Sequence, residues 1–329
     1  MQISALDVEI IPPEKARHRA NAVHRFEDQS PETQATLENI HFVILGAQKG
    51  GTTWLSDVIR KHEDAYIPVQ KELHYFNVID HYKNGPEWYA SYFKDAGDKK
   101  ILGEATPNYM WNYATPAEQN APDTDIRLHD MAPNLKALLP NAKLLACLRD
   151  PVARTASAYY HLATRARFAP RTPIRDCADR FGLLTMSRYD LQMDYWFRHV
   201  SRDDLKVIIY EDEIKPDEAK MNTANEVFRF IGLPEKEEHP AIFKRSNDKE
   251  KPALAWLRQI PGIKPKPFDW TRPIKPGERI AQGINRRLPQ TVQNMLDIKI
   301  SQADRDMLQE YFEPHNRRLE ELLERKLPW

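Results

Sequence analysis

The chain has 329 residues, and its 48 basic and 48 acidic side chains give a formal net charge of zero. This balance produces no overall field that would attract nucleic acid or an anionic membrane. The length fits one large α/β domain or two small ones. Two cysteines do not make a disulfide framework, and the sequence contains no apolar run of transmembrane length. We therefore expect no nucleic-acid partner and no membrane span.

Residues 1–39 are charged and polar, and they contain the pairs Pro12-Pro13 and Ser30-Pro31. We interpret them as an N-terminal extension, partly helical from Glu14 to Arg25, ahead of a single domain over residues 40–329. The extension has no signal-peptide core, so we expect a cytoplasmic protein. Cys147 lies in an apolar run, which predicts a buried free thiol.

The most informative segment begins just after this extension. The apolar run Phe42–Leu45 predicts a buried strand, and apolar residues recur at helical spacing from Trp54 onward. Between them lies a glycine-rich loop with one lysine. Free backbone N–H groups and the positive end of a helix dipole converge where a strand, a tight loop and a helix meet. The segment therefore predicts a site for a phosphate-like anion, formed by Gln48, Lys49, Gly50, Gly51, Thr52 and Thr53.

This loop differs from the nucleotide triphosphate motif G-x-x-x-x-G-K-[ST]. When the motif is aligned on Gly46 and Gly51, its lysine falls on Thr52, whereas the chain has its lysine at Lys49. A lysine ahead of the glycine pair approaches the anion from the other side, where it can meet a bridging oxygen or a leaving group. A glycine-rich turn with a solvated lysine is the alternative interpretation.

A second strand, turn and helix are predicted at Lys143–Leu148 and the residues after it. Arg149 ends the strand, at the carboxyl edge where open α/β sheets bind ligands. Pro151 suits the first turn of a helix. Arg154 and Ser157 are three residues apart and share a helix face, so an arginine fork and a serine hydroxyl can bind a second phosphate. The alternative is that Arg149 pairs with the aspartate after it and that the serine is an ordinary surface residue.

The remaining elements follow from the same periodicities. A short edge strand is predicted near Lys100–Leu102 and another strand at Lys206–Tyr210. Strands that alternate with helices imply a parallel sheet. Prolines interrupt every pattern within residues 245–300, which we interpret as a loop or lid region. Long helices are predicted over Pro151–Arg167, Tyr189–His199, Pro216–Ile231 and Gln302–Lys326.

Several ordered blocks resemble one known family. The loop Gly46–Thr53 resembles a 5′-phosphosulfate loop, and the pattern from Arg149 to Ser157 resembles a 3′-phosphate motif. On these motifs the chain resembles sulfotransferases that use 3′-phosphoadenosine 5′-phosphosulfate (PAPS), nearest the heparan-sulfate-type and bacterial branches. The resemblance covers residues 41–329. Further similar blocks are Lys71–Phe76 (E-x-H-F-F), Glu104–Tyr109 (E-K-T-P-x-Y), the late strand Val207–Asp212, the terminal helix Tyr311–Leu319 and the ending Leu327–Trp329.

The resemblance implies a P-loop-like three-layer α/β fold, with a central parallel sheet flanked by helices. It also implies in-line transfer of a sulfuryl group from PAPS to a hydroxyl, or in second place an amine, of a carbohydrate or small molecule. The product of the donor is adenosine 3′,5′-bisphosphate, and no metal is required. The family's glutamate base is matched by Glu72, and His74 is its catalytic neighbour or a structural histidine. Lys49 would stabilise the leaving phosphate.

The donor-binding residues are implied in the same way. Thr52 and Thr53, with the loop amides, would hold the 5′-phosphate, while Arg149 and Ser157 would hold the 3′-phosphate. Trp54 either stacks on the adenine or packs in the core. No Cys/His cluster in the sequence has metal-ligand spacing.

Two departures from the family pattern bear on the acceptor. Ala105 replaces the lysine of the heparan-type block, and no C-terminal K-G-R loop is recognisable, although Lys244–Lys251 lies in a comparable place. Both departures weaken the case for heparan sulfate as the acceptor. Arg165, Arg167, Arg171 and Arg175 form either a cationic cleft or, as we favour, a solvated loop.

Other classes of protein remain open at this stage. A P-loop kinase or nucleotide hydrolase would need its lysine at position 52 and a metal-binding acidic strand end, and magnesium dependence would identify it. A non-catalytic nucleotide-binding protein would not need both Lys49 and Glu72. The sequence does not define the oligomeric state.

Overall fold

The computed structural model describes residue 6 and residues 8–120, 128–165, 167–243 and 298–329. Five parallel strands form one sheet in the order β2-β3-β1-β4-β5. This is the central parallel sheet that the sequence predicts. The strands are β1 (Ile40–Gly46), β2 (Ala65–Tyr66), β3 (Ile101–Ala105), β4 (Lys143–Leu148) and β5 (Leu205–Ile209).

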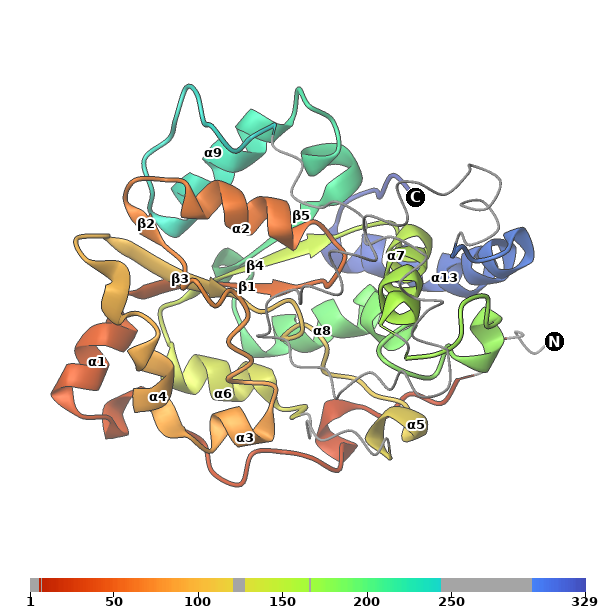
Figure 1. Ribbon diagram of the computed structural model, residues 1–329, viewed down its shortest axis with the longest axis horizontal. Helices are drawn as coiled ribbons and strands as arrows, with labels where there is room; N and C mark the ends of the chain where they lie inside the picture. Colours follow the sequence, from red (N-terminus) through yellow and green to blue (C-terminus); the bar gives the residue numbers. More distant parts are fainter. Residues whose placement is uncertain (1–5, 7, 121–127, 166, 244–297) are drawn as a thin grey trace, which may run out of the picture.

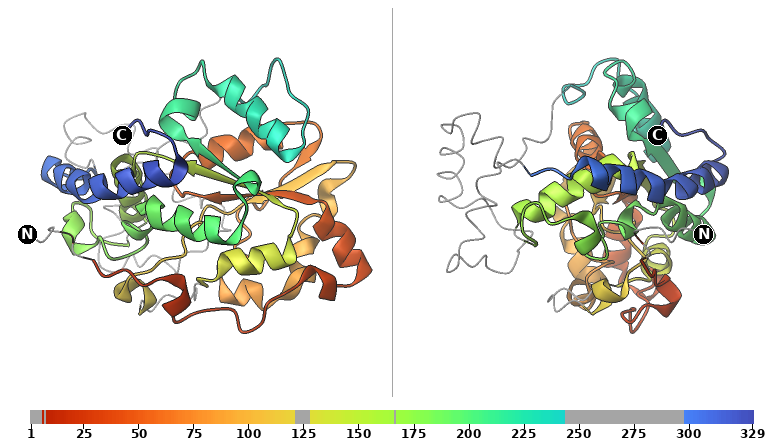
Figure 2. Two further views of the ribbon diagram at one scale, coloured as in Figure 1. Left: turned by 180° about the vertical axis from the view of Figure 1, so that it is seen from behind. Right: turned by 90° about the vertical axis from the view of Figure 1, so that its right-hand side faces the viewer.

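Helices cover both faces of the sheet (Figures 1 and 2). The alternation of side chains along β1 explains the two layers, because successive residues of a strand point to opposite faces. Phe42 and Ile44 pack with α2 (Thr52–Arg60) and α9 (Lys220–Ile231). Val43 and Leu45 face the other layer, which contains α1 (Pro31–Glu38), α4 (Gly85–Ser91), α6 (Met131–Leu138) and α8 (Tyr189–His199).

A third apolar cluster lies beside the sheet, where α7 (Pro151–Thr164) packs on α13 (Gln302–Leu323). Tyr159 and Phe312 are buried within it. Two short helices, α3 (Ile79–Tyr82) and α5 (Pro116–Gln119), complete the helices of the described part of the chain that Figure 1 labels. Asp150 caps α7 by accepting hydrogen bonds from Val152 N (3.0 Å) and Ala153 N (3.3 Å).

Some sequence-based boundaries were wrong. The strand predicted at the edge near Lys100–Leu102 lies inside the sheet, because the two-residue β2, too short to give a sequence pattern, pairs with its outer side. The helix predicted from Pro216 begins at Lys220. The helices predicted to end at Arg167 and Lys326 end at Thr164 and Leu323.

The region before the sheet contains no helix between Glu14 and Arg25 beyond a single turn at Pro13–Lys15, so that prediction was also wrong. Instead the segment lies extended on the fold. Ile11 forms a bridge with Ala114. The assignment of residues 1–39 as an extension stays a prediction. Residues 245–297 of the predicted proline-rich lid (245–300) lie outside the described part of the chain. The basic stretch Lys244–Lys251 lies outside it as well.

Candidate active site

The loop after β1 is held tightly against the neighbouring strand. Ala47 N donates to the Cys147 carbonyl (2.9 Å), and Gly50 N donates to the Ala47 carbonyl (2.8 Å). A Cβ at Gly50 would lie 2.3 Å from the Cys147 oxygen, so no larger residue fits. Gly51 has φ +113°, a conformation that favours glycine, and it is the N-cap residue of α2. The loop therefore brings the first amides of α2 to the carboxyl edge of the sheet, as an anion site requires.

The other predicted loop residues follow this geometry. Lys49 adopts a left-handed conformation with φ 69°. Thr52 is buried at the first position of α2. Thr53 accepts a hydrogen bond at Oγ1 from Lys71 Nζ (3.2 Å). Gln48 Nε2 donates to Asn108 Oδ1 (3.4 Å), which ties the loop to the segment after β3.

Lys71 connects the loop to the predicted base. Its neighbour Glu72 lies with Oε2 3.5 Å from His74 Nε2. Burial opposes ionisation of Glu72, but the His74 hydrogen bond and the charges of His74, Lys71 and Arg165 outweigh it and lower its pKa. The carboxylate is therefore ionised and able to accept a proton. The structure thus brings together the sequence-predicted Glu72 and His74, and Lys71 links their segment to Thr53.

His74 is fixed from several sides. Its backbone has φ 55°, and its Nδ1 lies 3.1 Å from Asn77 Oδ1. Its ring is almost fully buried, with a side-chain exposure of 5%, whereas the Glu72 side chain is 32% exposed. The carboxylate is thus the accessible member of the pair, and the histidine is placed to orient it.

The second predicted anion site starts at Arg149, at the end of β4. Its guanidinium lies over the ring of Tyr210, 5.0 Å from the centroid. The same ring would lie 2.9 Å from a Cβ on Gly51, so Arg149 and the glycine loop share a neighbour. Ser157 is partly buried on α7. The late-strand block therefore contributes Tyr210 to this region, a role that the sequence pattern did not reveal.

Arg154 does not join Ser157 in a phosphate fork, which corrects the prediction from helical spacing. Its side chain is 0% exposed. Its Nε donates to the Gln48 carbonyl (3.0 Å), and its Nη1 donates to the carbonyls of Gly182 (2.8 Å) and Leu183 (3.1 Å). Arg154 therefore braces the glycine loop from behind. The spacing of two residues on a helix cannot show which of them turns inward.

Trp54 packs in the core. It is 7% exposed, and its indole N–H donates to the Ile242 carbonyl (2.9 Å). This contact matches the packing alternative for the residue, while its place beside an adenine stays a prediction. Cys147 is buried and free, as expected, and burial raises the pKa of its thiol.

His161 was missed from the sequence, and Arg165 was assigned to a solvated loop. Both residues lie at the end of α7. Arg165 Nη1 donates to His161 Nδ1 (2.7 Å). Burial first, and then the charges of Arg165, Lys49 and Arg154, lower the pKa of His161 to about 2. Arg165 contributes least among the groups that lower the pKa of Glu72, and its assignment to a solvated loop stays a prediction. Ser157, His161 and Arg165 recur every four residues and therefore share one helix face. This spacing was the sequence signal that could have grouped them.

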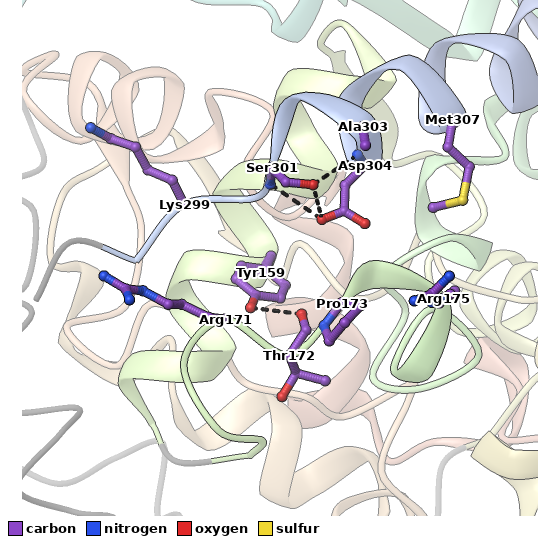
Figure 3. A pocket seen from close by; sticks show the side chains of 10 residues that line it. All are labelled: Tyr159, Arg171, Thr172, Pro173, Arg175, Lys299, Ser301, Ala303, Asp304 and Met307. Carbon is purple, nitrogen blue, oxygen red and sulfur yellow. Dashed lines mark hydrogen bonds between the residues drawn. The ribbon is translucent and has the colours of Figure 1, made fainter. Parts of the chain in front are cut away.

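A separate cavity of about 640 Å³ lies between the segment after α7 and the start of α13 (Figure 3). Arg171, Arg175 and Lys299 supply cations to its lining. Asp304 also lines it and accepts from Ser301 Oγ (2.7 Å). Two of the four arginines of the predicted cluster therefore line a cavity outside the glycine-loop site.

Two features are absent from the described residues. Within them, no group of three or more His, Cys, Asp or Glu side chains is arranged to hold a metal ion. Over the same residues, no helix combines the length and the apolar character needed to span a membrane.

These features define a P-loop-like α/β protein with an anion loop on its central strand and a carboxylate–histidine pair beside it. A sequence profile described as the Sulfotransferase family matches residues 42–237, more than half of the chain. The chain therefore belongs to the sulfotransferase family, which confirms the family and the enzyme class predicted from its motifs.

Individual relatives agree with this assignment. The chain is 39% identical over 123 residues to the membrane-associated sulfotransferase kil1 of Dictyostelium discoideum, covering 36% of this chain and 22% of that protein. It is 28% identical over 166 residues to human heparan sulfate glucosamine 3-O-sulfotransferase 6, covering 48% and 42%. The chain thus matches less than half the length of these curated relatives.

The fold is also found in a solved structure. A sulfotransferase from Alicyclobacillus acidocaldarius superposes with a TM-score of 0.55 at 20% identity, covering 88% of this chain and 97% of that one. At this identity the likeness concerns the fold, and it confirms the predicted P-loop-like α/β architecture.

Proposed function

We propose that this chain transfers the sulfuryl group of PAPS to a hydroxyl of a carbohydrate or small-molecule acceptor. An amine acceptor ranks second. The observation that carries the proposal is the hydrogen bond from Lys71 to Thr53 (3.2 Å). It holds the segment bearing the ionised Glu72 against the first turn of α2, where an anionic donor would bind.

In this proposal each residue has a distinct task. Lys49 lies against the bridging oxygen and stabilises the leaving phosphate, while Glu72 removes the acceptor proton and His74 orients it. Gln48, Gly50, Gly51, Thr52 and Thr53 surround the 5′-phosphate. Arg149 and Ser157 bind the 3′-phosphate, which distinguishes this donor from ATP. Sulfuryl transfer resembles phosphoryl transfer in depending mainly on positioning and electrostatics.

The reaction as proposed needs no metal, because Lys49 supplies the charge that a cation otherwise provides at the leaving group. The rival is a P-loop kinase or nucleotide hydrolase. The position of Lys49, three residues before the expected lysine, favours sulfuryl transfer. A cytoplasmic location also stays a prediction from the sequence.

The donor site is tested by calorimetric titration of the purified chain with adenosine 3′,5′-bisphosphate, ATP and 5′-AMP, with EDTA and then with magnesium. We expect tight binding of the bisphosphate alone, with EDTA present, and at least tenfold weaker binding after Arg149→Ala or Ser157→Ala. Equal or better binding of ATP, especially with magnesium, would instead identify a phosphoryl-transfer enzyme.

The catalytic assignment is tested by Glu72→Gln. We expect transfer from labelled PAPS to an accepted substrate to fall by about 10²–10⁴-fold, because the amide cannot take the acceptor proton. Bisphosphate affinity should stay within about twofold of the original. Glu87→Gln, at an exposed position of α4, is the matched control and should leave both quantities unchanged. Undiminished transfer by Glu72→Gln would refute the assignment of the base.

A further inference from the structure

A fully buried carboxylate lies behind the candidate base. Glu104, near the end of β3, is 0% exposed. Three hydroxyl groups donate to it: Tyr89 (2.8 Å) and Tyr109 (3.0 Å) to Oε1, and Thr106 (2.7 Å) to Oε2. A buried carboxylate without such donors would be strongly destabilising. Neither the donor nor the acceptor chemistry described above uses Glu104.

Two of these hydroxyls also accept hydrogen bonds from the segment that follows Glu72. Thr106 Oγ1 accepts from Leu73 N (3.0 Å) and His74 N (3.4 Å). The Tyr109 hydroxyl accepts from Phe76 N (3.4 Å). An ionised carboxylate only accepts, so it turns both hydroxyl protons toward itself and leaves the oxygen lone pairs for the backbone.

The backbone at this point needs support. His74 has φ 55°, a conformation that side-chain-bearing residues seldom adopt and that the surrounding contacts must maintain. Release of Leu73 N and His74 N from Thr106 would remove two of those contacts. The direction of the Glu72 side chain depends on this turn, because Glu72 directly precedes it.

The segment after β3 also contacts the glycine loop. Met110 N donates to the Leu45 carbonyl (2.8 Å). A Cβ at Gly46 would lie 2.6 Å from the Pro107 carbonyl oxygen. Residues 104–110 therefore touch both the donor loop and the base segment, and they set the distance between the two.

We propose that Glu104 and Thr106 are positioning residues that fix Glu72 relative to the donor loop through the backbone of Leu73 and His74. The inference rests on the proposed function, since it gives Glu72 a reaction to perform. It also joins two sequence motifs, Lys71–Phe76 and Glu104–Tyr109, into one hydrogen-bonded unit.

The ionised form of Glu104 that this role uses is the form that burial disfavours. Burial raises its pKa to about 7, against the three hydroxyl hydrogen bonds and the charge of His74, which lower it. The groups that face it are Tyr89 from α4, Thr106 and Tyr109 from its own segment, and His74 from the base segment. A protonated carboxyl would have to donate to a hydroxyl that now donates to it, so the arrangement is complete only in the ionised form.

The experiment compares two variants of Thr106 with a matched control in the full chain. Thr106→Val keeps the shape and removes the hydroxyl, whereas Thr106→Ser keeps the hydroxyl. Thr223→Val is the control, because this threonine is also buried and its hydroxyl donates to the backbone carbonyls of Glu213 (2.7 Å) and Ala219 (3.1 Å), not to Glu104 or the base segment. The readouts are kcat, bisphosphate affinity and hydrogen exchange over residues 71–76.

We expect Thr106→Val to lower kcat by about 10–100-fold, because small displacements of a reacting group have effects of this size. Bisphosphate affinity should change less than about twofold, and amide exchange over residues 71–76 should accelerate. Thr106→Ser should restore kcat and exchange protection. Thr223→Val should lower stability without lowering kcat.

The outcomes separate this inference from the proposed function. Faster exchange in Thr106→Val with an unchanged kcat would overturn the positioning role while leaving sulfuryl transfer intact. Unchanged exchange over residues 71–76 would overturn the network itself, whether or not the chain transfers sulfonate. Glu104→Gln is a second variant, since its amide presents a donor where hydroxyl protons now point. It should show the same lower kcat and the same faster exchange over residues 71–76 as Thr106→Val.

Discussion

At the scale of single residues, buried charges carry much of the organisation of the site. Arg154 and Glu104 are each 0% exposed, and each is surrounded by groups that match its hydrogen-bonding character. Arg154 donates to carbonyls, and Glu104 accepts from hydroxyls. Neither is assigned to the donor or the acceptor in the proposed function. Both hold segments that are, Arg154 at Gln48 and Glu104 through Thr106.

The raised pKa of Glu104 predicts a pH dependence of stability. The folded value of about 7 lies above the ordinary value of 4.5, so the folded state binds more protons between these pH values. The contribution of Glu104 to stability is therefore fully present below about pH 4.5 and is lost as the pH rises through 7. Its ionisation should lower the free energy of unfolding by about 2–4 kcal/mol.

Glu104→Gln should remove this component of the pH dependence. Urea denaturation at pH 5 and pH 8 measures this component. The difference between the free energies of unfolding at the two pH values should be smaller in the variant than in the unmodified chain. A difference as large as in the unmodified chain would assign the pH dependence to other groups. The ionised form of Glu104 completes the hydrogen bonds to the base segment, and it is also the form that burial disfavours.

At the scale of elements, the donor loop, β4 and α7 form one unit. The loop bonds to Cys147 of β4, and α7 reaches back to Gln48 through Arg154. Gly50 is the tightest point, since its missing Cβ would lie 2.3 Å from a backbone oxygen that cannot move without moving the strand. Packing at Gly50 therefore determines where the loop amides lie.

Gly50→Ala should displace the loop and weaken binding of adenosine 3′,5′-bisphosphate by at least tenfold, as measured by calorimetry, because loop amides hold the anion. Gly85→Ala is the control. Gly85 has φ +83° but no atom within 4 Å of the added Cβ, so the change should lower stability by about 1 kcal/mol and leave affinity unchanged. Unimpaired binding by Gly50→Ala would show that the loop adapts.

At the scale of the whole molecule, α13 joins the C-terminal part of the chain to α8 and α7. Asp190 on α8 is 0% exposed and accepts from Arg188 Nε and Nη2, each at 2.9 Å. His315 on α13 lies 3.4 Å from the same carboxylate. Burial opposes ionisation of Asp190, but His315 and Arg188 outweigh it and lower its pKa to about 2.

Asp190→Asn should lower the free energy of unfolding by about 3–5 kcal/mol at neutral pH, because it leaves Arg188 buried without its charge partner. The carboxylate contributes stability above its ordinary pKa of 3.8, and this is lost as the pH falls toward 2. Denaturation of the unmodified chain and of the variant at pH 7 and pH 3 measures this. The difference between their free energies of unfolding should be smaller at pH 3 than at pH 7. Asp217→Asn, at an exposed carboxylate that pairs with Lys220, should change stability by less than about 0.5 kcal/mol.

The sequence predicted most of this architecture and only part of the site. Strand β4 and helix α8 were predicted at their observed bounds, since their apolar periodicities are strong and local. The two-residue β2 carries no such pattern, so the sheet edge was misplaced. Arg154 was assigned to a ligand because helical spacing does not reveal which neighbour the side chain meets.

The contacts that join the motifs could not be predicted either. Lys71 to Thr53 and Thr106 to Leu73 connect residues 18 and 33 positions apart, and no local pattern records such pairs. Motif resemblance supplied the separate pieces, Glu72 and the glycine loop. Only the fold shows that Glu104 supports the first and that Arg154 supports the second.

The bracing of the donor loop has a consequence for the thermodynamics of binding. Its backbone is held by Cys147, by Arg154 and by an internal hydrogen bond, all within the protein itself. A loop fixed in this way has little conformational entropy left to lose when an anion arrives. We therefore expect the binding-competent conformation to dominate in the empty protein, so that little affinity is lost in selecting it. Substitution of Arg154, which has no contact with the donor in the proposed function, should therefore lower affinity by depopulating that state.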